Sequence, residues 1–564
     1  MPVKSGDIED VNIFRVAGVA VLVSLFSFLY YAKRGDLLLY GDAVAHINIA
    51  RRVFDSQTPG LLQLGTVWLP LPHLLMIPFI WSGTMWQNGT GGSFPSMIAY
   101  VLGVMGIFRL ARGLLKTEPR EKGTADSNAV LGGWAAALVY ASNPNLIYMQ
   151  ATAMTESVYL AFFIWAVVYF AEFIRTQRTE RNTLSLKTTA PRIPLMRCAG
   201  CLVGAELTRY DGWFLAGVVG SIVVVMTLRR WKIRDANQAV PRQTAVKFIL
   251  AIAIAPILWL AYNRVVYGNA FDFANGPYSA RAIELRVGAP NPAFHNAGVA
   301  AVYFLKSAQL NMARGDWGRL WLIAALLSTL IAIRKLRTRS LPILLLWVPL
   351  LFYALSIAYG SVPVHVYTWW PFATFNQRYG LQLLPMFAVS AGMLIAGIYR
   401  FAPLSSVGRK IVAPLVMFTL VAASYAFVWK ASPQCLQEAR RNWDIRHVLN
   451  SEVQQVVTKL PPNSHFLMDL GEHVGVMQQA GIPLRQVVNN ENHRPWKRPT
   501  DPEGLWERAL ADPPSYVDFV IAFDGDVVDQ AVSKAKLTEL IEIHATGQPH
   551  ARIYAARTAP NQSR

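Results

Sequence analysis

The sequence is poor in charged residues and in cysteine. Only 15% of its 564 residues are charged, whereas a soluble domain carries about 25%. With 53% hydrophobic residues and a mean hydropathy of +0.29, this shortage excludes an ordinary soluble enzyme, a disordered chain and a coiled coil. Three cysteines are too few for a disulfide framework. Membrane-spanning helices are the interpretation that remains.

Sequence signatures of several soluble enzyme classes are also absent. The chain contains no Gly-rich phosphate loop, no HExxH and no GxSxG. The net charge of +19 does not indicate nucleic-acid binding, because residues 432–564 carry 14 Lys and Arg against 16 Asp and Glu. All of the positive excess therefore lies in the apolar part, as expected of cytoplasmic loops in a membrane protein.

The apolar runs predict a polytopic α-helical membrane protein with about eleven transmembrane segments. Two of these runs, 198–207 and 213–228, are separated by only five residues and form a short hairpin. The eleven runs are 16–31, 94–108, 129–148, 158–174, 198–207, 213–228, 248–262, 320–333, 341–359, 381–399 and 411–428. Several are shorter than the ~20 residues of a straight span, so flanking residues must extend them.

Basic clusters follow every second run and predict the orientation. They place the N-terminus in the cytoplasm and residues 432–564 outside, with 1–431 as the membrane module. Residues 32–92 are predicted to form juxtamembrane helices on the outer face, including the proline-rich Trp68–Trp81. The tail is predicted to be an extracytoplasmic α/β domain with strands at 465–470, 516–523 and 552–555 and helices at 437–459 and 532–542.

Several polar residues gather on the predicted outer side. Asp42 and His46 are four apart and share one helix face. Asp42 is well placed to deprotonate a hydroxyl beside a lipid headgroup, but Gly41-Asp42 also resembles a helix start, so an N-cap role is equally open. Glu156 begins the fourth run, where it can cap the helix or share a cavity with Asp42.

Two arginines stand out because they lie at the outer ends of membrane segments. Arg209 and Asp211 occupy the hairpin tip, where ionisable groups indicate either a site or a simple pair at an exposed turn. Arg378 precedes the tenth run, and a guanidinium there suits a lipid phosphate. Two other groups are better explained without a metal: Cys198-Ala199-Gly200-Cys201 by helix packing, and Asp469, Glu472 and His473 as surface residues.

Taken in order, these motifs resemble the GT-C superfamily of membrane glycosyltransferases, and most closely its family 39. The matching motifs are Gly41-Asp42, Trp68-Leu69-Pro70-Leu71-Pro72, Asn143-Pro144, Met154-Thr155-Glu156-Ser157, Leu207-Thr208-Arg209-Tyr210-Asp211-Gly212 and Arg378-Tyr379 before Leu384-Pro385. Two departures are Ala43, where members often have a second acidic residue, and Trp68, where many have a Lys.

The resemblance implies an inverting transfer of a sugar, by a hexosyl- or pentosyltransferase, from a polyprenyl-phosphate donor to a protein, lipid or glycan acceptor outside the cell membrane. It implies that Asp42 is the catalytic carboxylate and that Arg378 and Arg209 contact the donor phosphate. His46, Glu156, Asp211, Tyr379 and Trp68 complete the expected substrate site. No cofactor or metal is required, although an Asp42–Glu156 pair could hold a divalent ion. An oligosaccharyltransferase and a lipid-linked sugar flippase are the alternatives.

Overall fold

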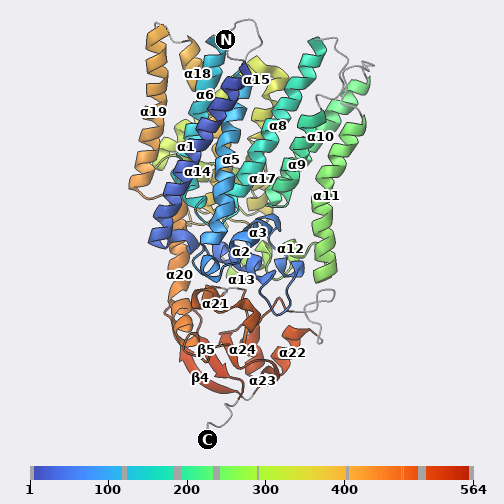
Figure 1. Ribbon diagram of the computed structural model, residues 1–564, viewed down its shortest axis with the longest axis vertical. Helices are drawn as coiled ribbons and strands as arrows, with labels where there is room; N and C mark the ends of the chain where they lie inside the picture. Colours follow the sequence, from blue (N-terminus) through green and yellow to red (C-terminus); the bar gives the residue numbers. More distant parts are fainter. Residues whose placement is uncertain are drawn as a thin grey trace.

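The computed structural model describes residues 5–116, 124–182, 192–232, 242–288, 291–401, 406–471, 473, 475–492, 504–535 and 537–557. A bundle of long helices holds the N-terminus at one end, and a smaller part with a β-sheet holds the C-terminus at the other (Figure 1). Short helices lie between the two parts.

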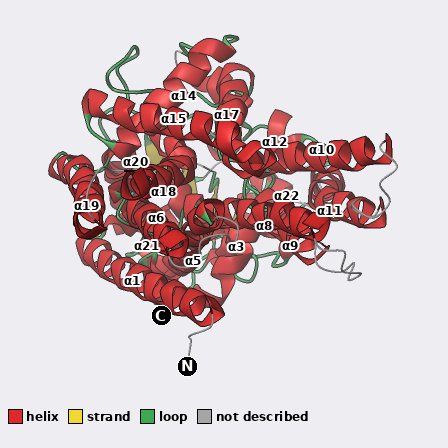
Figure 2. Cartoon of the chain, turned by 90° about the horizontal axis from the view of Figure 1, so that it is seen from above, coloured by secondary structure: helices red, strands yellow, loops and turns green. Residues whose placement is uncertain are grey.

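The bundle consists mainly of apolar helices. They are α1 (Ser5–Arg34), α5 (Thr90–Leu115), α6 (Thr124–Ala141), α8 (Glu156–Asn182), α9 (Arg192–Glu206), α10 (Tyr210–Lys232), α11 (Arg242–Tyr267), α14 (Ala297–Met312), α15 (Gly318–Leu336), α16 (Leu341–Leu345), α17 (Val348–Tyr359), α18 (Leu384–Phe401) and α19 (Ser406–Lys430). Along the bundle axis, α14, α15 and α17 group on one side, while α19 and the α10–α11 pair lie at opposite ends (Figure 2).

Seven helices in the described part of the chain are long and apolar enough to cross a membrane, or eight if the bent pair 338–345 and 348–359 is one span. The eleven predicted runs lie mainly in helices, but two of them are interrupted. The run at 129–148 breaks at Asn143 into α6 and α7 (Pro144–Met149), and the run at 341–359 breaks between α16 and α17. In addition, α9 has only 15 residues. Exposed apolar side chains on the bundle surface, such as Leu250, Leu258 and Phe418, are typical of a lipid-facing exterior.

Small residues let the central helices pack closely. α6 and α18 meet at Gly132 and Gly392, where a Cβ built on Gly392 would lie 2.3 Å from the carbonyl oxygen of Gly132. Glycine allows this approach of two backbones, as it often does between membrane helices. Helix α14 lies outside the eleven predicted apolar runs. It packs against α17 and η6 (Gln377–Leu383).

The short elements between bundle and sheet include α2 (Gly41–Arg52), α3 (Leu71–Met76), α12 (Asp272–Asn275) and α13 (Ala280–Val287) (Figure 1). The short helix α4 (Gly83–Gln87) packs against α2 and α5. The 3-10 turns are η1 (Asp36–Leu38), η2 (Leu61–Leu64), η3 (Ile77–Phe79), η4 (Gly315–Trp317), η5 (Arg337–Ser340) and η7 (Leu484–Gln486). The proline-rich stretch does not form a span, as predicted. It docks on the α9–α10 hairpin, where the Leu71 amide donates to the Leu207 carbonyl (3.0 Å).

The C-terminal part surrounds a five-stranded sheet of order β2-β1-β3-β5-β4. β1 is parallel to β2 and β3, whereas β5 is antiparallel to β3 and β4. Its elements are α20 (Gln434–Val457), β1 (Phe466–Met468), α21 (Gly475–Ala480), β2 (Val487–Val488), α22 (Leu505–Ala511), α23 (Pro513–Tyr516), β3 (Phe519–Phe523), α24 (Val527–Val532), β4 (Thr538–Ile543) and β5 (Ala551–Ala555).

The predicted strands near 466, 519 and 552 and the helix near 437 are present, but the helix predicted over 532–542 is wrong. Helix α24 ends at Val532, and Thr538–Ile543 forms the edge strand β4 instead. The first four residues of β4 are exposed and only Ile543 is buried, as expected of a strand at the edge of a sheet. Pairing with β5 over Ala551–Ala555 outweighs the local helix preference of this stretch.

Candidate functional site

Charged side chains from four separate segments meet at the end of the bundle nearest the sheet. Asp42 lies in the first turn of α2, Glu156 begins α8, Arg209 precedes α10 and Arg378 lies in η6. Glu156, Arg209 and Arg378 lie where apolar helices begin or end, and α2 follows α1 after the short turn η1. The ends of the helices thus bring the four residues together. Residues more than 300 positions apart in the chain thereby form one cluster.

Arg378 is the centre of the cluster. Its guanidinium pairs with the carboxylate of Asp42, and its Nε lies 3.2 Å from Oε1 of Glu156. A further nitrogen lies 3.4 Å from Oε1 of Glu438. Only 9% of the Arg378 side chain is exposed. A buried guanidinium requires such carboxylate partners, because an unpaired buried charge is strongly unfavourable.

Arg209 forms a second centre that shares Glu156 with the first. It lies 3.3 Å from Oε1 of Glu156 and 3.4 Å from Oδ1 of Asp211. It also donates hydrogen bonds to Thr155 (3.1 Å) and to the hydroxyl of Tyr353 (3.0 Å). The result is a row of alternating charge that runs from Asp42 through Arg378, Glu156 and Arg209 to Asp211.

One aromatic ring lies close to both guanidiniums. The Tyr379 ring lies 5.3 Å from the Arg378 guanidinium carbon and 5.2 Å from that of Arg209. The Tyr379 ring also stacks on that of Tyr353. Cation–π contact on this ring favours both cations and offsets part of the repulsion between two like charges held close together.

Glu438 of α20 holds the turn that carries Arg378. Its two carboxylate oxygens accept hydrogen bonds from the backbone amides of Asn376 (3.1 Å) and Gln377 (2.8 Å). Asn376 has a φ of +55°, a left-handed conformation that asparagine tolerates better than most residues. The carboxylate thus fixes a turn of unusual backbone geometry directly before Arg378.

His46 lies one helical turn beyond Asp42 and is buried. Its Nδ1 lies 2.9 Å from Nε2 of His73, and its ring packs against Trp68. Burial, with the Arg378 and Arg209 guanidiniums nearby, lowers the pKa of His46 to about 3. Burial also lowers the pKa of His73. At neutral pH both imidazoles are therefore uncharged, and one ring donates its N–H to the other.

Asp42 is the member of the row that reaches solvent. Its side chain is 38% exposed, whereas that of Glu156 is 1% exposed and that of Asp211 is 2% exposed. Asp42 is not the cap of α2, because Tyr40 occupies the N-cap position and makes no side-chain cap bond. A carboxylate that is accessible at one side and held by a guanidinium at the other is suited to proton transfer with an incoming hydroxyl.

The structure brings the residues singled out in the sequence together in this row, with His46, Tyr379 and Trp68 around it. The alternative of an exposed Arg209–Asp211 turn is wrong, because both side chains are largely buried. Arg378 occupies the space between Asp42 and Glu156 that was considered for a divalent ion. Glu438 and Tyr353 were not predicted, since one lies in an ordinary polar stretch and the other inside an apolar run.

The remaining candidates do not join this site. Cys198 is buried within the bundle, and neither it nor Cys201 is bonded to another cysteine. In the tail, the His473 ring stacks on Phe523 at 3.6 Å, while Glu472 lies outside the described residues.

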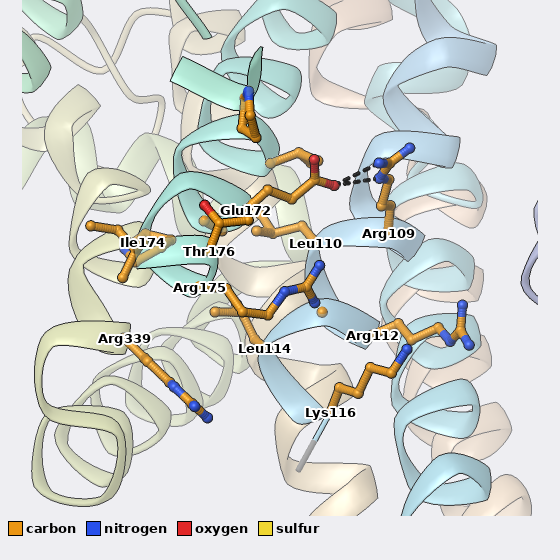
Figure 3. Close-up of a pocket in the computed structure, with 15 residues that line it drawn as sticks. Arg109, Leu110, Arg112, Leu114, Lys116, Glu172, Ile174, Arg175, Thr176 and Arg339 are labelled. Carbon is orange, nitrogen blue, oxygen red and sulfur yellow. Dashed lines mark hydrogen bonds and ion pairs between the residues drawn. The ribbon is translucent and has the colours of Figure 1, made fainter. Parts of the chain in front are cut away.

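A second charged pocket lies at the other end of α8. It is lined by the basic residues Arg109, Arg112, Lys116, Arg175 and Arg339, with Glu172 bound to Arg109 at 2.7 Å (Figure 3). Glu156 and Arg175 are 19 positions apart in α8, which corresponds to about 28 Å along the helix. This separation is close to the ~30 Å hydrocarbon thickness of a bilayer.

No protein-family model matches the chain, and no curated protein sequence matches it. Solved structures do match. ArnT from Cupriavidus metallidurans bound to undecaprenyl phosphate aligns over 99% of both chains with a TM-score of 0.52 and 13% identity. Its apo form aligns with a TM-score of 0.49 and 11% identity, over 97% of this chain and 98% of that chain.

The apo oligosaccharyltransferase from Archaeoglobus fulgidus aligns with a TM-score of 0.48 and 12% identity, over 97% of this chain and 74% of that chain. At 13% identity, the similarity to ArnT concerns the fold. This chain therefore shares the fold of the ArnT structure, in agreement with the fold that the resemblance of its motifs implies.

Proposed function

We propose that this membrane protein is a glycosyltransferase that moves a sugar from a polyprenyl-phosphate donor to a hydroxyl acceptor, with inversion at the sugar carbon. The observation that carries the proposal is the position of Arg378, held between the buried Glu156 and the half-exposed Asp42. The GT-C fold supports it, because the ArnT structure that shares this fold binds undecaprenyl phosphate.

Arg378 and Arg209 are the proposed contacts for the donor phosphate. Four carboxylates surround these two guanidiniums, so the phosphate must take a guanidinium away from a carboxylate rather than bind a free cation. Asp42 is the partner that it displaces, since Asp42 is the exposed one. Arg378 can grip two phosphate oxygens at once through its planar fork.

Asp42 is the proposed general base. A carboxylate released from a guanidinium accepts a proton more readily, so donor binding at Arg378 prepares Asp42 for its role. The acceptor oxygen then bonds to the anomeric carbon, the bond from that carbon to the phosphate oxygen breaks, and the acceptor proton passes to Asp42. The lipid phosphate gains one negative charge, which Arg378 and Arg209 stabilise as it develops.

The proposed site lies on the outer side of the cell membrane. The basic pocket around Arg112 and Arg175 supports a cytoplasmic location for the opposite end of the bundle. In this orientation residues 432–564 form an extracytoplasmic domain and residues 32–92 lie on the outer face. The acceptor, whether protein, lipid or glycan, reaches Asp42 from the same side as the donor headgroup.

The test is sugar transfer by the full-length protein, purified in detergent, from a panel of labelled sugars on a short-chain polyprenyl phosphate. Glycolipids and glycoproteins extracted from cells that lack the protein, compared by mass spectrometry, identify the sugar and the acceptor. Undecaprenyl phosphate is the probe for the donor site, with inorganic phosphate as the control that lacks a lipid tail. Wild-type protein that retains no undecaprenyl phosphate and transfers no sugar from the panel would contradict the proposal.

A further inference from the structure

The hairpin between β4 and β5 carries two histidines and a carboxylate at its base, far along the chain from the charged row. Glu542 lies in β4, and His544 and His550 flank the five-residue turn that leads into β5. Gly547, with a φ of +73°, allows this turn. In the described part of the chain, these three residues are the one group of three or more His, Cys, Asp or Glu whose ligand atoms all lie within 4.8 Å of one another.

The distances within this group approach those of a tetrahedral metal site. Nε2 of His544 lies 3.4 Å from Oε2 of Glu542, and Nδ1 of His550 lies 3.8 Å from Oε1 of the same carboxylate. Ligands at about 2.0–2.2 Å from a tetrahedral ion are about 3.3–3.6 Å apart. The side chains of His544 and His550 are 59% and 42% exposed, so their rotation can close the remaining gap.

The surroundings of Glu542 leave one of its oxygens available. Arg552 donates to Oε1 of Glu542 at 2.9 Å, while Oε2 faces His544. A hydrogen-bonded second oxygen is the usual support of a carboxylate ligand. Asp524 lies 3.5 Å from Nδ1 of His550 and can fill a fourth position.

The local charge also suits a divalent cation. Arg552 is within 3.4 Å of three carboxylates, those of Asp524, Asp529 and Glu542. These carboxylates exceed the guanidinium by two negative charges, and the two histidines add nitrogen ligands. A site with two imidazoles and one or two carboxylates has the donor set of zinc rather than that of calcium or magnesium.

We propose that Glu542, His544 and His550 bind a zinc ion that clips the two ends of the β4–β5 turn together. The ion is structural for the hairpin and takes no part in sugar transfer. Closing the β4–β5 turn on folding has an entropic cost. Zinc bonds to both ends of the turn offset this cost, so zinc binding stabilises this edge of the sheet.

The experiment uses the full-length protein in detergent, purified with a tag that contains no histidine and stripped of metal by a chelator. Zn²⁺ is titrated in competition with a chromogenic chelator, and Co²⁺ is used separately because its visible absorption reports tetrahedral coordination. We expect one Zn²⁺ per chain, a tetrahedral Co²⁺ spectrum and a rise in the unfolding temperature with Zn²⁺. Mg²⁺ at the same concentration has no such effect.

His544→Ala is the test variant and His465→Ala its matched control, because His465 is an exposed tail histidine that faces a single carboxylate at 3.7 Å. We expect His544→Ala to weaken Zn²⁺ binding about tenfold or more and to abolish the rise in unfolding temperature, and His465→Ala to leave both unchanged. Glu542→Gln is a second test should the first variant fold poorly. Absence of Zn²⁺ binding by the wild type, or equal binding by the folded His544→Ala and Glu542→Gln variants, overturns the proposal.

Discussion

Arg378 pairs with Asp42, although 336 positions separate them in the chain. The pair joins the first juxtamembrane helix to the turn that leads into α18, and it places a solvent-facing carboxylate against a buried guanidinium. In the proposed reaction these two side chains exchange partners, since Arg378 turns to the donor phosphate and Asp42 to the acceptor hydroxyl.

Replacement of Asp42 by Asn removes the proposed base while it retains the shape of the side chain. We expect kcat to fall about 10²-fold or more, the usual scale for loss of acid–base catalysis. The donor KM should not rise, because Arg378 loses a competing carboxylate. Folding should change little, since Tyr40, not Asp42, occupies the N-cap of α2. Asp36→Asn is the control, because Asp36 pairs with Arg34 outside the row (3.0 Å).

Replacement of Arg378 tests the phosphate contact. Arg378→Ala should abolish retention of undecaprenyl phosphate and, because Glu156 loses one of its two cations, destabilise the protein by about 3 kcal/mol. Arg378→Lys should keep the charge and most of the stability but recover only part of the donor affinity, since an ammonium cannot make the bidentate contact. Equal donor KM and kcat in the wild type and the folded Ala variant would remove Arg378 from the site.

Glu438→Gln tests whether α20 positions Arg378. A glutamine offers one carbonyl oxygen, so it keeps one of the bonds to the amides of Asn376 and Gln377 and turns an N–H toward the other. We expect a loss of about 1–3 kcal/mol in stability and a drop of about tenfold in kcat/KM through displacement of Arg378. Glu452→Gln, on the exposed face of the same helix, should change neither quantity.

The pH dependence of stability should report His46. Its pKa is about 3 in the folded protein, because it is buried near two guanidiniums, and about 6.5 when unfolded. The unfolded chain therefore binds more protons between these values, and the stability contributed by His46 is lost as the pH falls from about 6.5 toward 3, by at most about 5 kcal/mol. The unfolding temperature in detergent should drop at acid pH, and less so in His46→Gln. A parallel drop in both proteins would contradict this assignment.

Cysteine accessibility should report the orientation. In a background with Cys201 replaced by Ala, Thr179→Cys in α8 should resist an impermeant thiol reagent in spheroplasts, whereas Ser515→Cys in the tail should react. Cys198 and Cys435 are buried and should remain silent, as the background protein alone will check. Labelling of Thr179→Cys would reverse the proposed topology.

Much of the site could be predicted because its residues stand out against their surroundings. Glu156, Arg209 and Arg378 each lie within a few residues of an apolar run, where a charged group has a steep solvation cost and so indicates a specific environment. Asp42 stands out because it follows the first apolar run in the outer stretch 32–92 and shares a helix face with His46. Glu438 could not be found in this way, since carboxylates are common in the polar stretch around it. Its role depends on how α20 passes η6, which is a tertiary relationship without a local signal.

The same limit explains the errors in the fold. Helix α14 contains the buried polar residues Lys306, Gln309 and Asn311. They lower its hydropathy, so no long apolar run marks this helix in the sequence. Edge strand β4 has glutamates that also suit a helix, and only the partner strand decides between the two. In both cases neighbours that are distant in the chain determine the outcome.

Glu438 lies in α20, late in the chain, so the charged site can be completed only late in protein synthesis. Glu156 and Glu438 are 282 positions apart, so at 5–20 residues per second the ribosome needs roughly 15–60 s between them. During this interval the nascent chain holds Glu156, Asp211 and Arg209 without the turn that Glu438 secures. In the proposed function, the protein therefore stays inactive until α20 has been made, and a chain that stops before residue 438 forms the bundle without a complete site.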